Sequence, residues 1–218
     1  FRYLLEHNGI TVKNKKALVL GKGGASKAVI AVLEELGAKE ILTVYYKENP
    51  ETITYEECYK NHADAEIIVN TTPVGMYPKA DDCPIDLSRF QNLSGVADVV
   101  YNPLRTQLIV EAEKRGIPAA GGLEMLVAQA KRACELFTGR TIADSEIDRI
   151  EKILSSDMQN LVIIGMPGSG KTLIADLLGE KLGRPVVSSD DMIVERAGKS
   201  IPEIFAQEGE EAFRRCCF

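Results

Sequence analysis

Eight residues near the end of the chain have the spacing of a phosphate-binding loop. The stretch from Gly165 to Thr172 reads Gly-Met-Pro-Gly-Ser-Gly-Lys-Thr and fits the pattern G-x-x-x-x-G-K-S/T. Its glycines let several backbone amides point at one phosphate, and the N-terminus of the following helix adds about half a positive charge. Lys171 is expected to reach the β- and γ-phosphates, and Thr172 is expected to ligate Mg²⁺. The residues predicted to hold ATP are Gly168, Ser169, Gly170, Lys171 and Thr172.

A second glycine-rich turn lies near the start of the chain, where residues 21–26 read Gly-Lys-Gly-Gly-Ala-Ser. Gly21 permits a tight turn, Gly23 lets the backbone approach a pyrophosphate, and Ser26 is small enough for close packing of helix on strand. The turn predicts a dinucleotide site, although glycine turns after strands also occur without a ligand. The residues predicted to hold the pyrophosphate are Gly21, Lys22, Gly23, Gly24 and Ala25.

The end of the second predicted strand indicates which dinucleotide is bound. NAD sites usually carry a carboxylate there for the ribose 2′-hydroxyl, whereas this chain reads Tyr45-Tyr46-Lys47. A cation favours NADP, because its 2′-phosphate needs a positive partner. We therefore predict NADP, with Tyr46 and Lys47 beside its ribose. In the alternative interpretation Lys47 is a solvated loop residue, and Glu48 next to it would repel the phosphate.

The elements that position these residues alternate between strand and helix. Helices are expected at 2–8, 26–36, 106–115 and 123–137, and strands at 17–20, 41–46, 66–69 and 95–100, with a further short strand after residue 116. This alternation is typical of a parallel sheet with helices on both faces. The expected class is α/β.

We expect two domains joined by a helix. Residues 1–138 are predicted to form a Rossmann-like parallel-sheet domain, residues 139–159 a linker helix, and residues 160–218 a partial P-loop α/β domain. The first strand of that second domain is expected at 161–164, and another is expected to end at Asp190. The chain is expected to be cut at both ends relative to a longer gene product.

The composition of the chain argues against two classes of partner, nucleic acids and membranes. The formal net charge is −6 and the sequence shows no basic stripe, so nucleic acid is not predicted as a partner. No apolar run approaches the ~20 residues that span a bilayer, so no membrane partner is predicted either. The five cysteines lack metal-site spacing, which indicates a reduced, cytoplasmic protein.

Three further segments of the first domain have distinctive sequences. They are Asn-Thr-Thr-Pro-Val-Gly-Met at 70–76, Asp-Val-Val-Tyr-Asn-Pro at 98–103 and Gly-Gly-Leu-Glu-Met-Leu-Val-Ala-Gln at 121–129. In sequence, order and spacing these segments resemble shikimate dehydrogenase. The resemblance covers about residues 1–138 and implies reduction of 3-dehydroshikimate to shikimate with NADPH. Lys47 stands where that family usually has an arginine.

The same resemblance implies roles for individual residues. On the nicotinamide side it places Thr71, Thr72, Pro73, Val74 and Val99, and facing the substrate cleft it places Tyr101, Gly122 and Gln129. In the alternative interpretation, the Thr-Thr-Pro segment is only a strand-ending turn, Tyr101 lies in an ordinary loop and Gln129 faces solvent. The family's catalytic lysine and aspartate lie in an N-terminal domain absent from this sequence. We therefore expect exposed apolar surface on 122–137, and self-association through it.

Residues 160–215 resemble shikimate kinase, through the phosphate-binding loop and the segments 198–205 and 208–215. The resemblance implies that Asp190 binds the shikimate hydroxyl and acts as base, that Arg214 binds the shikimate carboxylate, and that Lys171 assists phosphoryl transfer. Ser188 stands where the family usually has a metal-binding aspartate. Alternatively, Asp190 only caps a helix and Arg214 is solvated. At 59 residues, 160–218 is expected to fold incompletely by itself.

The leading hypothesis is a fragment of a bifunctional shikimate-pathway enzyme, with 3-dehydroshikimate and shikimate as substrates and NADP, ATP and Mg²⁺ as cofactors. One alternative is a nucleotide-binding fragment that turns nothing over. Another is a dehydrogenase of the quinate/shikimate type.

Overall fold

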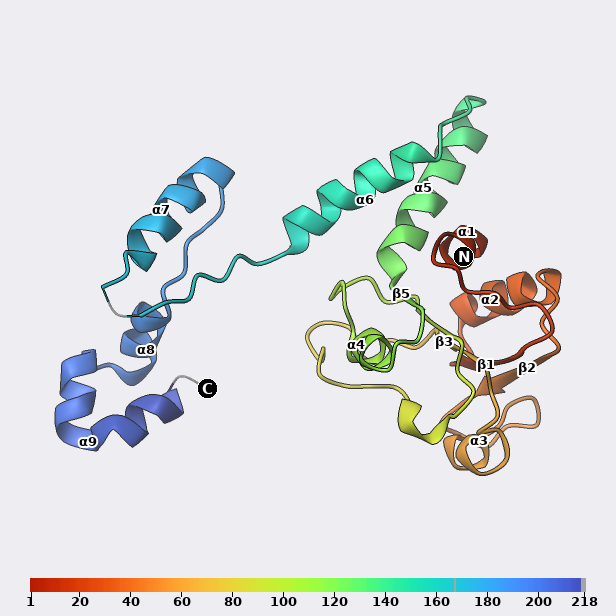
Figure 1. Cartoon of the computed structure of the whole chain (residues 1–218), viewed down its shortest axis with the longest axis horizontal. Coiled ribbons are helices and arrows are strands. Elements are labelled where there is room, and N and C mark those ends of the chain that lie inside the picture. Colours follow the sequence, from red (N-terminus) through yellow and green to blue (C-terminus); the bar gives the residue numbers. More distant parts are fainter. Residues whose placement is uncertain (167, 217–218) are drawn as a thin grey trace. The chain divides into compact units, whose positions relative to one another are not determined.

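The computed structural model of the protein describes residues 1–166 and 168–216, and for residues 208 and 210–216 it describes the backbone only. The chain forms two compact units, Phe1–Gln159 and Asn160–Phe218 (Figure 1). Among the described residues, no helix combines the length and the apolar character needed to cross a membrane.

The first unit is built on a five-stranded sheet in which every neighbouring pair is parallel, in the order β2-β1-β3-β4-β5. The apolar runs of the sequence form these strands because both sheet faces are covered, which suits continuous hydrophobic segments. The strands are β1 Lys16–Leu20, β2 Glu40–Val44, β3 Ile67–Asn70, β4 Gly95–Asp98 and β5 Ala119–Ala120.

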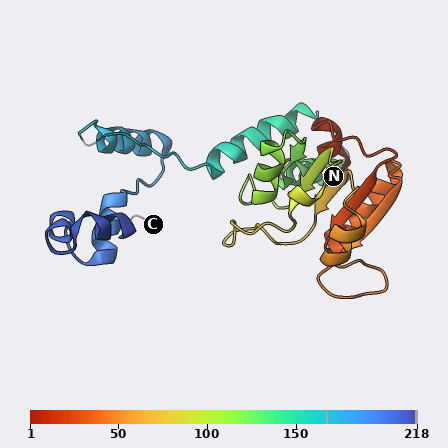
Figure 2. The same ribbon diagram turned by 60° about the horizontal axis from the view of Figure 1, so that its bottom comes forward.

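Helices pack on both faces of this sheet, as the alternation predicts (Figure 2). Side chains of β1 alternate between two buried clusters: Ala17 and Val19 meet one set of helices, and Leu18 and Leu20 meet the other. The first set is α1 Arg2–His7 and α2 Gly24–Glu35. The second is α3 Tyr55–Asn61, the 3-10 turn η1 Leu87–Arg89 and α4 Gln107–Lys114.

Two helices complete the unit: α5 Gly122–Thr138 and α6 Ser145–Met158. We expected residues 139–159 to form a linker helix, whereas α6 packs on α5 within the first unit and buries Ile147. The amphipathic pattern of α6 supplies this apolar face. The exposed apolar surface expected on α5 is present at its end, where Leu136 is 69% and Phe137 90% exposed.

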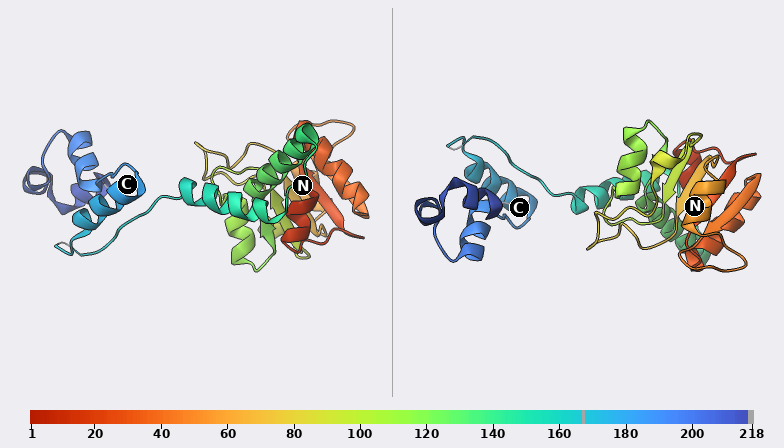
Figure 3. Two further views of the ribbon diagram at one scale, coloured as in Figure 1. Left: turned by 90° about the horizontal axis from the view of Figure 1, so that it is seen from above. Right: turned by 90° about the horizontal axis from the view of Figure 1, so that it is seen from below.

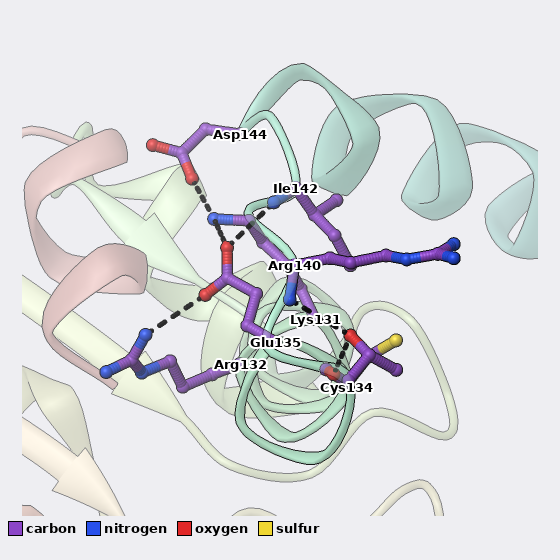
Figure 4. Close-up of polar contacts among 8 residues, drawn as sticks. Lys131, Arg132, Cys134, Glu135, Arg140, Ile142 and Asp144 are labelled. Carbon is purple, nitrogen blue, oxygen red and sulfur yellow. Dashed lines mark hydrogen bonds and ion pairs between the residues drawn. The ribbon is translucent and has the colours of Figure 1, made fainter.

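Glu135 holds the connection between α5 and α6 (Figure 4). The helix stops at Gly139, which adopts the left-handed conformation, and Glu135 then accepts a hydrogen bond from the amide of Ile142 at 3.0 Å. Arg132 donates to the other carboxylate oxygen at 3.1 Å, and Lys131 pairs with Asp144. The Ile142 amide and then Arg132 hold the pKa of Glu135 below its ordinary value. One carboxylate thus joins the helix end to the turn.

The described part of the second unit consists of helices and coil. Its helices are α7 Lys171–Leu182, α8 Ser189–Ala197 and α9 Ile201–Cys216, which is kinked at Gly209. The strand expected at 161–164 is not formed: residues 161–166 run as coil (Figure 3). Val162 and Ile164 are 80% and 86% exposed. The prediction of a strand that ends at Asp190 is also wrong, because residues 184–188 run as coil. A strand needs a paired neighbour, and no strand occurs in the described part of this unit.

A charged contact joins α1 to α5 in the first unit. Glu124 is nearly buried and accepts hydrogen bonds from His7 Nδ1 and, at 2.6 Å, from Asn8 Nδ2. The hydrogen bond and the negative charge of Glu124 raise the pKa of His7 above its ordinary value. The imidazolium form of His7 is therefore favoured in the folded state.

This contact predicts a pH-dependent contribution to stability. A raised histidine pKa stabilises the fold fully below the unfolded value, about 6.5, and the contribution is lost as pH rises through the folded value. His7→Ala should lower the free energy of unfolding by at most about 1 kcal/mol at pH 6, because the His7 ring is half exposed, and by less at pH 9. All seven tyrosines lie in the first unit and the chain has no tryptophan, so urea unfolding followed by tyrosine fluorescence measures this unit alone.

Asn8→Ala is the matched control, because it removes a neutral donor to the same carboxylate. Its effect should not change between these pH values. An effect of His7→Ala that grew with pH would contradict the assignment.

Candidate functional site

The carboxyl ends of four parallel strands bring most of the predicted site residues of the first unit to one edge of the sheet. In the register of the sheet, Leu20 at the end of β1 lies opposite Val44 of β2 and Asn70 of β3, and Asn70 lies opposite Asp98 of β4. The order of the strands reverses beside β1, because β2 lies on one side of it and β3 on the other. Such a switch point is where open parallel sheets bind ligands.

The glycine turn follows β1 at this point, as predicted. Gly21 has φ +103°, and its amide donates to the carbonyl of Val44 at 2.9 Å. Gly23 is the N-cap of α2 and accepts a 2.7 Å hydrogen bond from the Ser26 hydroxyl through its carbonyl. A Cβ built on Gly23 would meet no atom within 4 Å. In the described part of the chain, the amides of residues 22–24 donate to no protein group, so they are available to an anion.

The end of β3 is tied closely to the glycine turn. Thr71 donates through its hydroxyl to the carbonyl of Leu20 at 2.6 Å. A Cβ on Gly21 would lie 3.0 Å from Thr71 Oγ1 and 3.0 Å from Thr72 Cγ2. Glycine at position 21 is thus required both by its φ and by the approach of the two threonines.

A buried carboxylate shapes the segment 71–74. Asp98 at the end of β4 is fully buried and accepts hydrogen bonds from Asn70 Nδ2 at 2.9 Å and from Thr106 Oγ1 at 2.7 Å. Burial raises the pKa of Asp98, and the hydrogen bonds from Thr106, Asn70 and the Val100 amide act in the opposite direction. Through its own Oδ1, Asn70 accepts from the amide and hydroxyl of Thr72 at 3.0 and 2.7 Å.

The sequence predicted no role for Asn70, Asp98 or Thr106, although Asn70 and Asp98 belong to the segments 70–76 and 98–103. The available signal was a polar residue at the end of each of two apolar runs, which parallel pairing brings side by side.

The residues predicted to face the substrate are spread over the loop after β4 and the helix α5. Tyr101 is 45% exposed. Gly122 donates its amide to the Val100 carbonyl at 3.0 Å, and a Cβ there would lie 2.2 Å from the Val99 carbonyl oxygen. Gln129 lies two helical turns further along α5 with an exposed side chain, so its substrate role stays a prediction.

Tyr46 and Lys47 lie beyond β2, which ends at Val44, two residues before the predicted end. Both side chains are exposed; the Tyr45 and Tyr46 ring centroids are 4.5 Å apart, and Lys47 Nζ lies 5.1 Å from the Tyr46 centroid. The hydrogen bond from Tyr45 and then the nearby Lys47 lower the pKa of Tyr46. Lys47 is thus available at the surface, as its predicted role requires.

The phosphate-binding loop of the second unit has the expected glycine conformations. Gly168 and Gly170 have φ of +76° and +79°, and α7 begins at Lys171 with Thr172 exposed in its first turn. The Lys171 ammonium donates to the Met166 carbonyl of its own loop at 2.8 Å.

The predicted phosphoryl-acceptor residues are arranged differently from expectation. Asp190 lies in the first turn of α8, not at a strand tip, and Ser188 is the N-cap, accepting from the Asp191 amide. The alternative interpretation, in which Asp190 caps a helix, is therefore also wrong, because Ser188 holds the N-cap position. Arg214 lies on α9, and its side chain is outside the described residues. The described residues contain no group of three or more acidic, histidine or cysteine side chains able to hold a metal ion.

Two hollows in the described part of the first unit are lined by residues other than the predicted site residues. One, of about 750 Å³, is lined by the loop after β2 and the start of α3. The other, of about 370 Å³, is apolar and lies between α5 and α6. No predicted site residue lines either of them.

The doubly covered parallel sheet, with a glycine turn at its switch point, defines a Rossmann-like α/β unit. The first unit is homologous to the NADP-binding region of shikimate dehydrogenases, and the end of the chain matches the shikimate kinases. The family model of the shikimate 5′-dehydrogenase C-terminal domain matches residues 122–146, and that of shikimate kinase matches residues 167–216.

Individual relatives carry this homology. A shikimate dehydrogenase (NADP(+)) of Clostridium beijerinckii is 39% identical over 146 residues, which cover 63% of this chain and 53% of that protein. A chorismate mutase/shikimate 5-dehydrogenase fusion protein from Clostridium acetobutylicum has a TM-score of 0.67 at 31% identity, covering 72% of this chain and 60% of that chain. Shikimate 5-dehydrogenase from Thermus thermophilus, solved with NADP(H) and shikimate, has a TM-score of 0.59 at 29% identity, covering 69% and 59%. The chain spans about half the length of the curated relatives it matches first.

The close approach at Gly122 predicts a severe packing defect. Gly122→Ala should lower the free energy of unfolding of the first unit by about 2–3 kcal/mol, because backbone must move to accept the methyl group. Urea unfolding followed by tyrosine fluorescence measures this change. Gly24→Ala is the control, because its Cβ meets nothing within 4 Å, and it should leave stability unchanged or slightly raised. Equal losses in the two variants would contradict the packing argument.

Proposed function

We propose that the first unit binds NADP(H) and presents its nicotinamide for the interconversion of 3-dehydroshikimate and shikimate. The observation that carries this proposal is the glycine turn at the switch point, where the amides of residues 22–24 have no acceptor among the described protein groups and the space above Gly23 is open. Homology to NADP-dependent shikimate dehydrogenases supports the choice of cofactor and substrate.

In this proposal, different residues along the edge of the sheet bind different parts of the cofactor and the substrate. NADPH supplies a hydride when it is bound. The turn of residues 21–25 holds the pyrophosphate through backbone amides and the N-terminus of α2. Thr71, Thr72, Pro73, Val74 and Val99 form the nicotinamide side, and the hydrogen bonds of Asn70 and Asp98 fix the turn on which the first four lie. Tyr101, Gly122 and Gln129 belong to the substrate side in this proposal.

The proposal for the second unit is that it carries the front part of a shikimate kinase, supported by the family-model match and the glycine conformations of its loop. Lys171 and Thr172 would contact ATP and Mg²⁺, and Asp190 and Arg214 would bind shikimate. A unit that binds nucleotide without turnover is the second candidate, favoured by the lack of a sheet beneath the loop in the described part of this unit.

The dinucleotide proposal predicts a selective binding defect in one variant. Gly23→Ala places a methyl group in space that is empty in the protein but would be filled by pyrophosphate. The dissociation constant for NADPH should rise by about tenfold or more, while the thermal midpoint of the first unit stays unchanged. Nucleotide fluorescence on titration of the whole protein with NADPH measures the first quantity, and tyrosine fluorescence on heating measures the second.

Catalysis is tested separately on the same protein. Shikimate oxidation is followed by absorbance of NADPH with NADP⁺ present, and phosphorylation is followed by ADP release with ATP, Mg²⁺ and shikimate. NADPH binding without either activity would support the non-catalytic candidate. Wild-type protein that binds neither NADPH nor NADH would overturn the proposed function.

A further inference from the structure

An ion pair joins the glycine turn to the loop that follows β2. Lys22 is the second residue of the turn, and its Nζ donates to Glu51 Oε2 at 2.9 Å and to Asn49 Oδ1 at 3.0 Å. Asn49 also accepts from the backbone amide of Glu51 through the same oxygen. The loop therefore presents two acceptors to one ammonium group.

The backbone explains why this loop reaches the glycine turn. Ile53 forms an isolated parallel bridge to Val44: its amide donates to the Thr43 carbonyl, and its carbonyl accepts from the Tyr45 amide, both at 2.9 Å. The loop thus folds back against the end of β2, and Asn49 and Glu51 contact Lys22 in the glycine turn. In Rossmann-like units the ribose of the adenosine half lies between these two features.

Of the two lysines near the predicted ribose position, Lys22 is better placed than Lys47 to bind an anionic group. Its side chain is 34% exposed and is held by the two acceptors, whereas Lys47 is exposed and lies over the Tyr46 ring. Glu51 is 78% exposed, so it is free to move into solvent. The hydrogen bond and charge of Lys22 lower the pKa of Glu51, which keeps the carboxylate ionised.

We propose that Lys22 is the main cation for the ribose 2′-phosphate of NADP(H), and that Glu51 is a built-in counter-ion which the phosphate displaces. The inference rests on the proposed dinucleotide function and adds a residue that decides between NADP and NAD. A 2′-phosphate carries about −1.5 to −2 charges, whereas Glu51 carries a single charge and its exposed ion pair is weak, so the exchange favours the phosphate. NAD has no 2′-phosphate and leaves the pair intact.

The test measures dissociation constants of the whole protein for NADP⁺ and NAD⁺ by calorimetry, with 2′,5′-ADP and 5′-ADP as probes of the adenosine half. Lys22→Gln should weaken NADP⁺ and 2′,5′-ADP by about tenfold and change NAD⁺ and 5′-ADP by less than about twofold. Glu51→Gln should tighten NADP⁺ by about threefold, because the phosphate no longer competes with a carboxylate.

Two matched controls carry the same charge changes at neighbouring positions. Lys47→Gln should weaken NADP⁺ less than Lys22→Gln does, and Glu48→Gln should tighten it less than Glu51→Gln does. In the double variant Lys22→Gln/Glu51→Gln, the tighter NADP⁺ binding that Glu51→Gln causes alone should be absent, because the Glu51 carboxylate acts through Lys22.

Each of the remaining possible results contradicts a different part of the proposal. If Glu51→Gln tightened NADP⁺ binding equally with and without Lys22, Glu51 would act as an independent charge. That result would overturn the proposed displacement of Glu51 by the 2′-phosphate. A larger loss from Lys47→Gln than from Lys22→Gln would overturn the assignment of the main cation. Wild-type protein that binds neither dinucleotide would reject the proposed function itself, and thereby this inference, whereas the first two outcomes leave dinucleotide binding in place.

Discussion

The candidate site depends on the parallel pairing of β1 with β3 and of β3 with β4. This pairing aligns Leu20, Asn70 and Asp98 across the sheet, so that three chain reversals begin at one edge. Two hydrogen bonds connect these reversals. The Thr71 hydroxyl donates to the Leu20 carbonyl, and the side-chain amide of Asn70 donates to the Asp98 carboxylate. Because these bonds are shielded from water, they keep a nearly fixed geometry at a polar edge.

Glycine serves two separate purposes around this edge. At positions 21 and 122 it is required by the protein itself, because threonine side chains or a backbone carbonyl occupy the space of a Cβ. At position 23 the protein makes no such demand, and the space that a Cβ would fill is open to the dinucleotide we propose. The contrast separates two glycines that the fold needs from one that it does not need, which a glycine pattern in the sequence cannot do.

Much of the first unit could be predicted from local pattern. Residues 17–20, 66–69 and 95–100 are short, mostly apolar runs between turn residues, and they form β1, β3 and β4 within one or two residues of the expected bounds. The same reasoning failed at 161–164, where an equally apolar run stays coil. Local preference is identical in the two cases, and only a paired neighbour makes a strand. The contact of Lys22 with Glu51 joins residues 29 positions apart, and no local pattern indicates it. The contact of Asn70 with Asp98 joins residues 28 positions apart, and it follows only once the two strands are known to pair.

The coil segments on either side of α7 have a consequence for handling the protein. Residues 161–164 and Val186-Val187 are rich in β-branched side chains, and Val162, Ile164 and Val187 are 70% or more exposed. Extended apolar backbone of this kind is a template onto which a second molecule adds as a strand, as in amyloid nucleation. These exposed β-branched segments are therefore where we expect association between molecules to begin at high concentration.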